Sequence, residues 1–175
     1  MQRSVEEMMP AGMEVKVAKI DDVTDYEKPL VASFTVKGSI GSATGKRLLI
    51  PGDIFESRTK PTFSHEKREQ GIYFEYPYMM KDAVRVNFPK TFSVESLPAG
   101  ETAQYQKSIA YGLKTEQTPT SVTFRREFDI VDILYKSEEY KDLRAFYSKF
   151  ETKDQENVVL KFAADSSGNT KASTN

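Results

Sequence analysis

Apolar and polar residues alternate along most of this chain of 175 residues. Successive side chains of a strand point to opposite faces of a sheet, so a period of two predicts strands with one buried face. The pattern is found at residues 13–17, 30–36, 46–50, 72–80, 84–88, 92–94, 103–111, 121–135 and 158–162. Short runs of this kind, separated by Gly, Pro and Asp turns, predict a mainly all-β fold of two antiparallel sheets packed as a β-sandwich. An open barrel is the alternative.

Several irregularities interrupt the alternation. A change of phase at residues 18–20 predicts a bulge or the end of a strand, and the run 121–135 changes parity in a way that predicts a bulge near Ile130. Pro77 cannot donate to a ladder, which predicts an edge or a break within 72–80. The run 103–111 is read as one strand. The three glycines of 38–45 predict a turn-rich link.

One segment changes to helical spacing near the C-terminus. Ser137 can act as an N-cap, and the glutamates that follow it suit the positive end of a helix. The apolar positions are Tyr140, Leu143, Phe146 or Tyr147, and Phe150. This spacing predicts one short amphipathic helix packed on the sandwich.

The length favours a single domain. We expect residues 1–12 to be a linker or the end of a preceding domain, 13–162 to be the sandwich, and the polar segment 163–175 to be a disordered tail. The longest apolar stretch, 48–50, is followed by Pro51, so no membrane span is predicted. The first residues lack the apolar run of a signal peptide, and a signal for export would have to precede residue 1.

The composition excludes several kinds of chemistry. The chain has no Cys and a single histidine, His65, which excludes a thiolate nucleophile, a disulfide and a multi-histidine metal site. A net charge of −1 argues against nucleic acid as a partner. We therefore predict no catalytic, cofactor-binding or metal-ligating residues, and no cofactor.

Two motifs resemble catalytic or phosphate-binding sequences without matching them. The segment 41–46 is one residue short of a phosphate-binding loop, has Arg47 where Ser or Thr should hold magnesium, and leads into a strand. Its central Ala43 also excludes a nucleophile elbow around Ser42. In the segment 65–69, Glu69 replaces the second histidine of a zinc-protease helix. We interpret the first segment as a turn and the second as a solvated charged loop.

Two further groups of residues have both a functional and a structural interpretation. Asp21, Asp22 and Asp25 could suit calcium, but they lack the spacing of a known loop, and an acidic turn between strands is favoured. The aromatic residues of 72–80 could stack a sugar or a peptide, although core packing is favoured. These residues are Tyr73, which has the opposite parity, and Phe74, Tyr76 and Tyr78.

The segment 51–70 is long for a loop in a compact domain, and such loops often bind a ligand. Residues 53–55 are expected to form a helical turn, and Phe63 is expected to attach the loop to the body. The cations Arg58, Lys60, Lys67 and Arg68 are then expected to be exposed.

The order of several segments resembles one bacterial family. These segments are 13–17, 28–30, 45–53, 82–89, 94–98, 140–147 and 154–156. The sequence resembles the C-terminal β-rich domain of exported transglutaminase-like proteins, which carry an N-terminal domain of unknown function and a papain-like transglutaminase core. That core uses a Cys-His-Asp triad, in which a thiolate attacks a glutamine amide.

Since this chain has no Cys, the resemblance implies a non-catalytic accessory domain that packs on, or positions, an upstream transglutaminase-like core of the same polypeptide. It also implies a periplasmic or extracellular location. The alternative is an independent glycan- or peptide-binding module with an exposed aromatic patch near Tyr73 or a groove beside 51–70. A hydrolase would need two facing carboxylates, which the sequence does not place.

Overall fold

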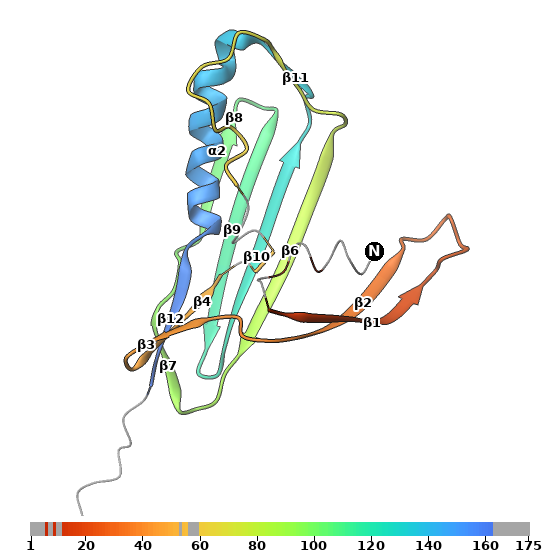
Figure 1. Ribbon diagram of the computed structural model, residues 1–175. Helices are drawn as coiled ribbons and strands as arrows, with labels where there is room; N and C mark the ends of the chain where they lie inside the picture. The colour runs from red at the N-terminus through yellow and green to blue at the C-terminus, as the bar shows by residue number, and fades with distance from the viewer. Residues whose placement is uncertain (1–5, 7–8, 10–11, 53, 56–59, 163–175) are drawn as a thin grey trace, which may run out of the picture.

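The computed structural model describes residues 6, 9, 12–52, 54–55 and 60–162 (Figure 1). In this part of the chain the elements are, in order, β1 (Glu14–Asp21), β2 (Val31–Lys37), β3 (Ser42–Thr44), β4 (Arg47–Pro51), β5 (Ile72–Tyr73), β6 (Tyr78–Asn87), β7 (Phe92–Ser96), β8 (Glu101–Tyr105), β9 (Ile109–Thr118), β10 (Ser121–Ile130), β11 (Leu134–Tyr135), the 3₁₀ helix η1 (Ser137–Glu139), α2 (Tyr140–Asp154) and β12 (Asn157–Phe162). The predicted linker 1–12 and the tail 163–175 lie almost entirely outside the described residues.

The first layer is an antiparallel sheet of strand order β6-β10-β9-β8. Strand β10 lies in its interior and pairs without interruption with β6 on one side and β9 on the other. The even-numbered residues of β10 face the core, and Val122, Phe124, Phe128 and Ile130 are all buried. The alternation in this segment therefore defines the inner face, as the sequence predicts.

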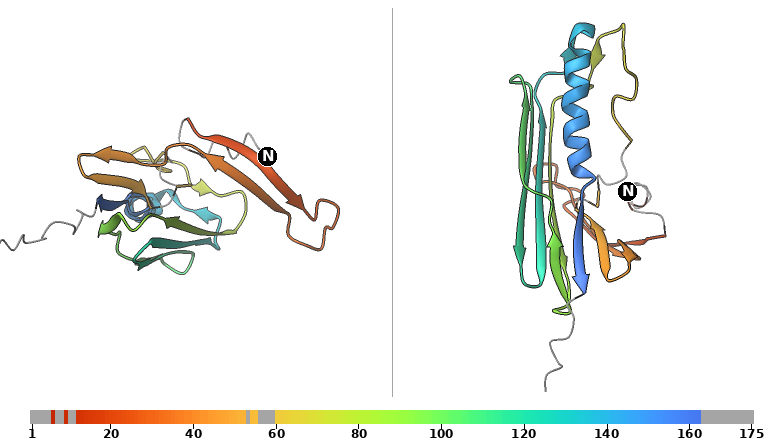
Figure 2. Two further views of the ribbon diagram at one scale, coloured as in Figure 1. Left: turned by 90° about the horizontal axis from the view of Figure 1, so that it is seen from below. Right: turned by 90° about the vertical axis from the view of Figure 1, so that its left-hand side faces the viewer.

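The second layer is shared between a sheet and a helix. The antiparallel sheet β3-β4-β12-β7 covers one half of the first sheet, and α2 covers the other half (Figure 2). Val158 and Leu160 of β12 and Leu143 of α2 are fully buried in one continuous core. The predicted two-sheet sandwich with one amphipathic helix is confirmed, and none of the described residues closes it into a barrel.

The helix begins differently from the prediction. Ser137 is not the N-cap, because the extended residue Lys136 occupies that position before η1. The backbone N–H of Lys136 donates to the carboxylate of Glu139 at 2.8 Å, so the capping carboxylate reaches back from the first turn. The predicted apolar stripe is correct, since Tyr140, Leu143, Tyr147 and Phe150 are buried.

Some of the predictions made from irregularities in the alternation are confirmed and others are wrong. The register of β1 against β2 shifts between Val17 and Lys19, which confirms the bulge. The prediction of a bulge near Ile130 is wrong, because β10 ends at this residue and the chain continues to β11. The run 103–111 is two strands, not one, because Gln106 adopts a positive φ of 52° and reverses the chain without a Gly, Pro, Asn or Asp. Residues 42–44, predicted as part of a link, form β3.

The hairpin β1–β2 projects away from the two-layered body (Figure 1). Among the described residues, its two strands pair only with each other. The helices found in the described ranges include none that is long and apolar enough to span a membrane.

Candidate functional site

The projecting hairpin has one apolar and one charged face. Val15, Val17 and Ile20 of β1 lie opposite Val36, Phe34 and Ala32 of β2. On the other face, Lys16 lies opposite Thr35 and Lys19 opposite Ser33, and Lys19 forms an ion pair with Asp21 at 2.8 Å. Val17 and Ile20 remain 38% and 39% exposed, although such an alternating face is normally covered. The hairpin thus presents an amphipathic ribbon with its apolar side partly open to solvent.

The predicted acidic turn is confirmed at the far end of this hairpin. Asp21 ends β1, and Asp22 and Asp25 lie in the connection to β2. The ammonium group of Lys28 lies 2.9 Å from Asp25 and 4.0 Å from Asp22, so a cation of the chain itself occupies this group of carboxylates. Val23, Tyr26 and Leu30 are exposed in the same connection and extend the apolar surface of the hairpin.

The prediction of a charged loop at 65–69 is confirmed, whereas the prediction of a turn at 41–46 is only partly correct, because residues 42–44 form β3. The segment 41–46 contains the tight turn of the β3–β4 hairpin, where Gly45 has a positive φ of 60°. Residues 64–70 form an exposed segment that includes His65. The hydroxyl of Tyr140 donates to the backbone carbonyl of His65, so the contact of this residue with the body is through its main chain.

The segment 51–70 is attached to α2 as predicted. Phe63 is buried and packs edge-on against Tyr140 and Tyr147, with ring centroids 5.6 and 4.8 Å apart. The backbone N–H of Thr62 donates to Glu151 at 2.9 Å, and Arg144 donates to the carbonyl of Phe63 at 3.1 Å.

The cations of this segment are only partly described. Lys60, Lys67 and Arg68 are exposed, as expected. Arg58 lies outside the described residues, and so does Asp53, while Ile54 and Phe55 form part of a turn.

The prediction of core packing in the aromatic segment 72–80 is correct for Ile72, Phe74, Tyr78 and Met80 but wrong for Tyr76. Phe74 and Tyr78 are half-buried, but Tyr73 is 65% and Tyr76 is 62% exposed. Tyr76 shares the parity of these inward residues, but it lies between β5 and β6, where the chain has left the sheet, and β6 begins just after Pro77. Tyr73 lies opposite Leu134 of β11, which is 71% exposed. An exposed apolar pair is therefore present at β5–β11.

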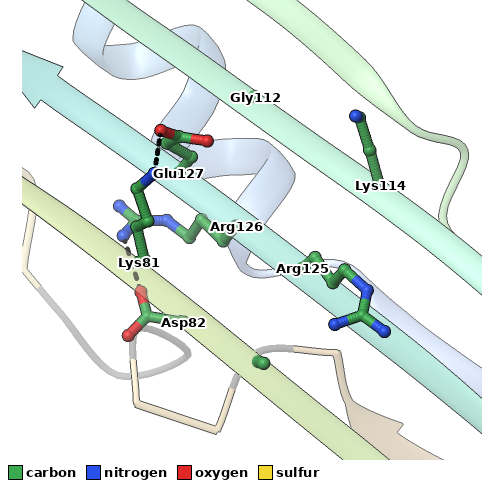
Figure 3. Close-up of a pocket in the computed structure, with 8 residues that line it drawn as sticks. Lys81, Asp82, Gly112, Lys114, Arg125, Arg126 and Glu127 are labelled. Carbon is green, nitrogen blue, oxygen red and sulfur yellow. Dashed lines mark hydrogen bonds and ion pairs between the residues drawn. The ribbon is translucent and has the colours of Figure 1, made fainter.

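A buried polar cluster that the sequence analysis missed links α2 to the first sheet. Arg126 of β10 points into the core, where its guanidinium lies 2.9 Å from Asp154 of α2 and 3.1 Å from Asp82 of β6 (Figure 3). The hydroxyl of Tyr111 donates to Asp154 at 2.7 Å. The signal was present in the sequence, since Arg126 has the same parity as Phe124 and Phe128.

The electrostatics of this cluster favour a structural role. Burial, and secondarily the hydrogen bond to Asp154, raise the pKa of the Tyr111 hydroxyl, which therefore stays protonated. A guanidinium lies between the two carboxylates, so they do not face each other across open space as a hydrolytic pair would. Within the described ranges there is also no group of three or more acidic or histidine side chains that could hold a metal ion.

Comparisons with known proteins place the body in a family. Residues 46–160 match the family described as a domain of unknown function with solved structure (DUF3858), whereas no curated protein matches. The crystal structure of a putative protease from Parabacteroides distasonis is similar with a TM-score of 0.49 and 9% sequence identity, covering 56% of this chain and 19% of that one. The hairpin β1–β2 lies outside the residues that match the family. Because the match spans about two thirds of the sequence, the chain belongs to the DUF3858 family.

Proposed function

We propose that this chain is a non-catalytic interaction domain that docks onto a transglutaminase-like core of the same polypeptide through the apolar face of the hairpin β1–β2. In this proposal the chain is the C-terminal domain of a bacterial protein that acts in the periplasm or outside the cell. The domain carries no chemistry of its own and holds or shapes the core by packing against it. No cofactor is required.

The observation that carries the proposal is the open apolar face of the hairpin. A two-stranded ribbon is marginally stable by itself in water, and strands with one apolar face gain stability when that face is buried. In this chain Val17, Ile20 and the tip residue Tyr26 are exposed, while the opposite face carries ion pairs. Clustered exposed apolar residues of this kind mark a protein interaction site more often than a random part of the surface.

The resemblance supplies the identity of the occupant. In the transglutaminase-like proteins that the sequence resembles, the domain that precedes the C-terminal β domain is the catalytic core. Strand β1 begins at Glu14, so a domain joined before residue 1 would be connected through a short segment to the hairpin. The effective concentration of two linked domains is high, and a modest apolar face then suffices for docking.

The test compares the longer polypeptide with a variant of the hairpin. Val17→Thr, Ile20→Thr and Phe34→Thr together keep strand-forming residues but remove apolar surface. We expect the wild-type hairpin to be protected from hydrogen exchange in the longer polypeptide and exposed in the chain of 175 residues. The triple variant should lose that protection, whereas a control with Lys16→Thr and Lys19→Thr should keep it.

Three results would contradict this proposal in whole or in part. The first is a reading frame that encodes no transglutaminase-like core before residue 1. The second is a hairpin that exchanges equally fast with and without the core. The third is equal cross-linking or amide-hydrolysing activity of the longer polypeptide with and without residues 13–162, which would show that the domain does not support the core.

A second candidate function is the binding of a glycan or peptide at the exposed pair Tyr73 and Leu134, with Tyr76 nearby in sequence. Aromatic side chains that are open to solvent provide stacking surfaces for sugar rings. Titration with chitin and glucan oligosaccharides, and with a peptide library, tests this function. Tyr73→Ala should weaken such binding, and replacement of the more exposed Tyr26 by Ala should not; equal effects, or no binding, would exclude it.

A further inference from the structure

The outer face of the first sheet, opposite the core, has a hollow at its centre. The hollow has a volume of about 310 Å³ and is lined by β6, β9 and β10 (Figure 3). Gly112 of β9 and Ala83 of β6 flank Arg125 and Glu127 of β10 and leave the space above the sheet open. A Cβ atom added to Gly112 would meet no other atom within 4 Å, so the hollow results directly from a glycine in the middle of a strand.

Two cations lie side by side at the rim of this hollow. Lys114 of β9 and Arg125 of β10 are direct cross-strand partners. Like charges directly opposite each other destabilise a sheet, and Figure 3 shows the charged ends of the two side chains turned away from each other. Among the described residues, neither cation has an ion-pair partner. The chain thus keeps an unfavourable pair of charges at a surface hollow.

The remaining charges of the rim are already paired. Lys81 lies 2.7 Å from Glu127 across β6 and β10, and this carboxylate also raises the pKa of Lys81. Asp82 turns to the inner face, where Arg126 holds it. The carboxylates around the hollow are therefore engaged elsewhere, and Lys114 and Arg125 are left to attract an anion.

We propose that this hollow binds an acidic segment of a peptide, with one carboxylate at Lys114, a second at Arg125 and the aliphatic part of the segment over Gly112 and Ala83. A guanidinium binds a carboxylate with two parallel hydrogen bonds, and an ammonium group adds a second charge. The volume is at the lower end of small-ligand sites, which fits one or two side chains. With 25 cationic and 26 anionic residues, the whole chain does not attract long polyanions, so a short acidic segment fits better than a charged polymer.

The experiment uses the chain of 175 residues and a fluorescein-labelled peptide, acetyl-Ala-Glu-Ala-Glu-Ala, followed by fluorescence anisotropy at low and high salt. The matched peptide with Gln in place of Glu is the control for charge. Lys114→Gln with Arg125→Gln should weaken binding of the acidic peptide at least tenfold. Gly112→Leu keeps every charge but fills the hollow, and it should weaken binding about fivefold. The control Lys67→Gln with Arg68→Gln removes the same charge from the exposed segment 64–70 and should leave binding unchanged.

Three results would overturn the proposal. One is equal binding of the Glu and Gln peptides, or no binding of either at millimolar concentration. Another is an equal loss in the Lys67 and Arg68 control, which would show a non-specific effect of charge. The third is preferential binding of a sulfated oligosaccharide over the acidic peptide. The melting temperatures of the variants separate loss of binding from loss of folding, and removing the like-charged pair should not lower the melting temperature.

Discussion

The hairpin β1–β2 and strand β10 share the same alternation of apolar and polar residues but differ in what covers them. In β10 the inward residues Val122 and Phe124 are 1% and 2% exposed, because α2 and the second sheet lie on that face. In the hairpin, Val17 and Ile20 keep more than a third of their surface open. The alternation therefore predicts a strand and its apolar face, whereas the cover of that face depends on segments far away in the sequence or on another domain.

The difference in cover predicts that deleting an apolar side chain costs much more stability in β10 than in the hairpin. Phe128 of β10 is buried among the rings of Tyr78, Tyr147 and Phe150, so Phe128→Ala should lower the free energy of unfolding by about 3–5 kcal/mol. Phe34→Ala in the hairpin should cost less than about 1 kcal/mol, since its face is only half covered. Urea unfolding of both variants measures this difference. Equal costs would mean that the hairpin is part of the same core.

A buried and an exposed ion pair of the body should differ in what they contribute to its stability. Arg126→Met leaves the buried carboxylate of Asp154 without its guanidinium, and it should destabilise the body by about 3–5 kcal/mol. Arg47→Met removes the exposed ion pair with Glu95 and should have a much smaller effect. Thermal unfolding followed by circular dichroism compares the two variants. A variant of Arg126 as stable as that of Arg47 would show that the cluster contributes little.

The third prediction separates two buried hydroxyls within the body. Tyr111 donates to Asp154, so Tyr111→Phe leaves an acceptor without its donor and should cost about 1–2 kcal/mol. The hydroxyl of Tyr147 is buried and, among the described residues, has no hydrogen-bond partner. Tyr147→Phe should therefore leave stability unchanged or raise it by up to about 1 kcal/mol. A larger loss in Tyr147→Phe than in Tyr111→Phe, measured by urea unfolding, would reverse this interpretation.

The same two tyrosines predict how the body responds to alkaline pH. Burial raises the pKa of Tyr111 and of Tyr147 above the usual value of 10. Above about pH 10 the unfolded chain loses these protons and the folded chain keeps them, so the free energy of unfolding falls as pH rises, by at most about 1.4 kcal/mol per pH unit and group. Each Phe variant should reduce this slope. A slope unchanged in both variants would show that other groups control the alkaline transition.

The sequence was informative where local rules decide the structure. The parity of 121–130, the bulge at Ala18, the break before Tyr78 and the helical stripe of 140–150 all follow from side-chain periodicity and from proline chemistry. The attachment of the loop by Phe63 is also predictable, because a large apolar side chain in a polar segment tends to be buried.

The features that the sequence does not predict depend on contacts between segments that are far apart in the chain. The turn at Gln106 is stabilised by the pairing of β8 with β9, which allows a positive φ in a residue with no intrinsic preference for it. The parity of 72–80 predicts that Tyr76 is buried, but the chain is outside the sheet at this residue and its side chain is exposed. The cluster around Arg126 joins three elements, and the hollow at Gly112 joins three strands, so neither can be read from one segment.

The smallest expected effect on stability comes from removing apolar side chains from the hairpin. If the apolar face of the hairpin awaits a separate domain, the combined variant Val17→Thr, Ile20→Thr and Phe34→Thr should change the free energy of unfolding of the 175-residue chain by less than about 1 kcal/mol. It should also reduce the binding of a dye such as ANS that reports exposed apolar surface. The corresponding triple replacement at Val122, Phe124 and Phe128 should unfold the chain, because those side chains have their partners within it. A large loss of stability in the hairpin variant would place the cover of that face within the chain and remove the need for an external core.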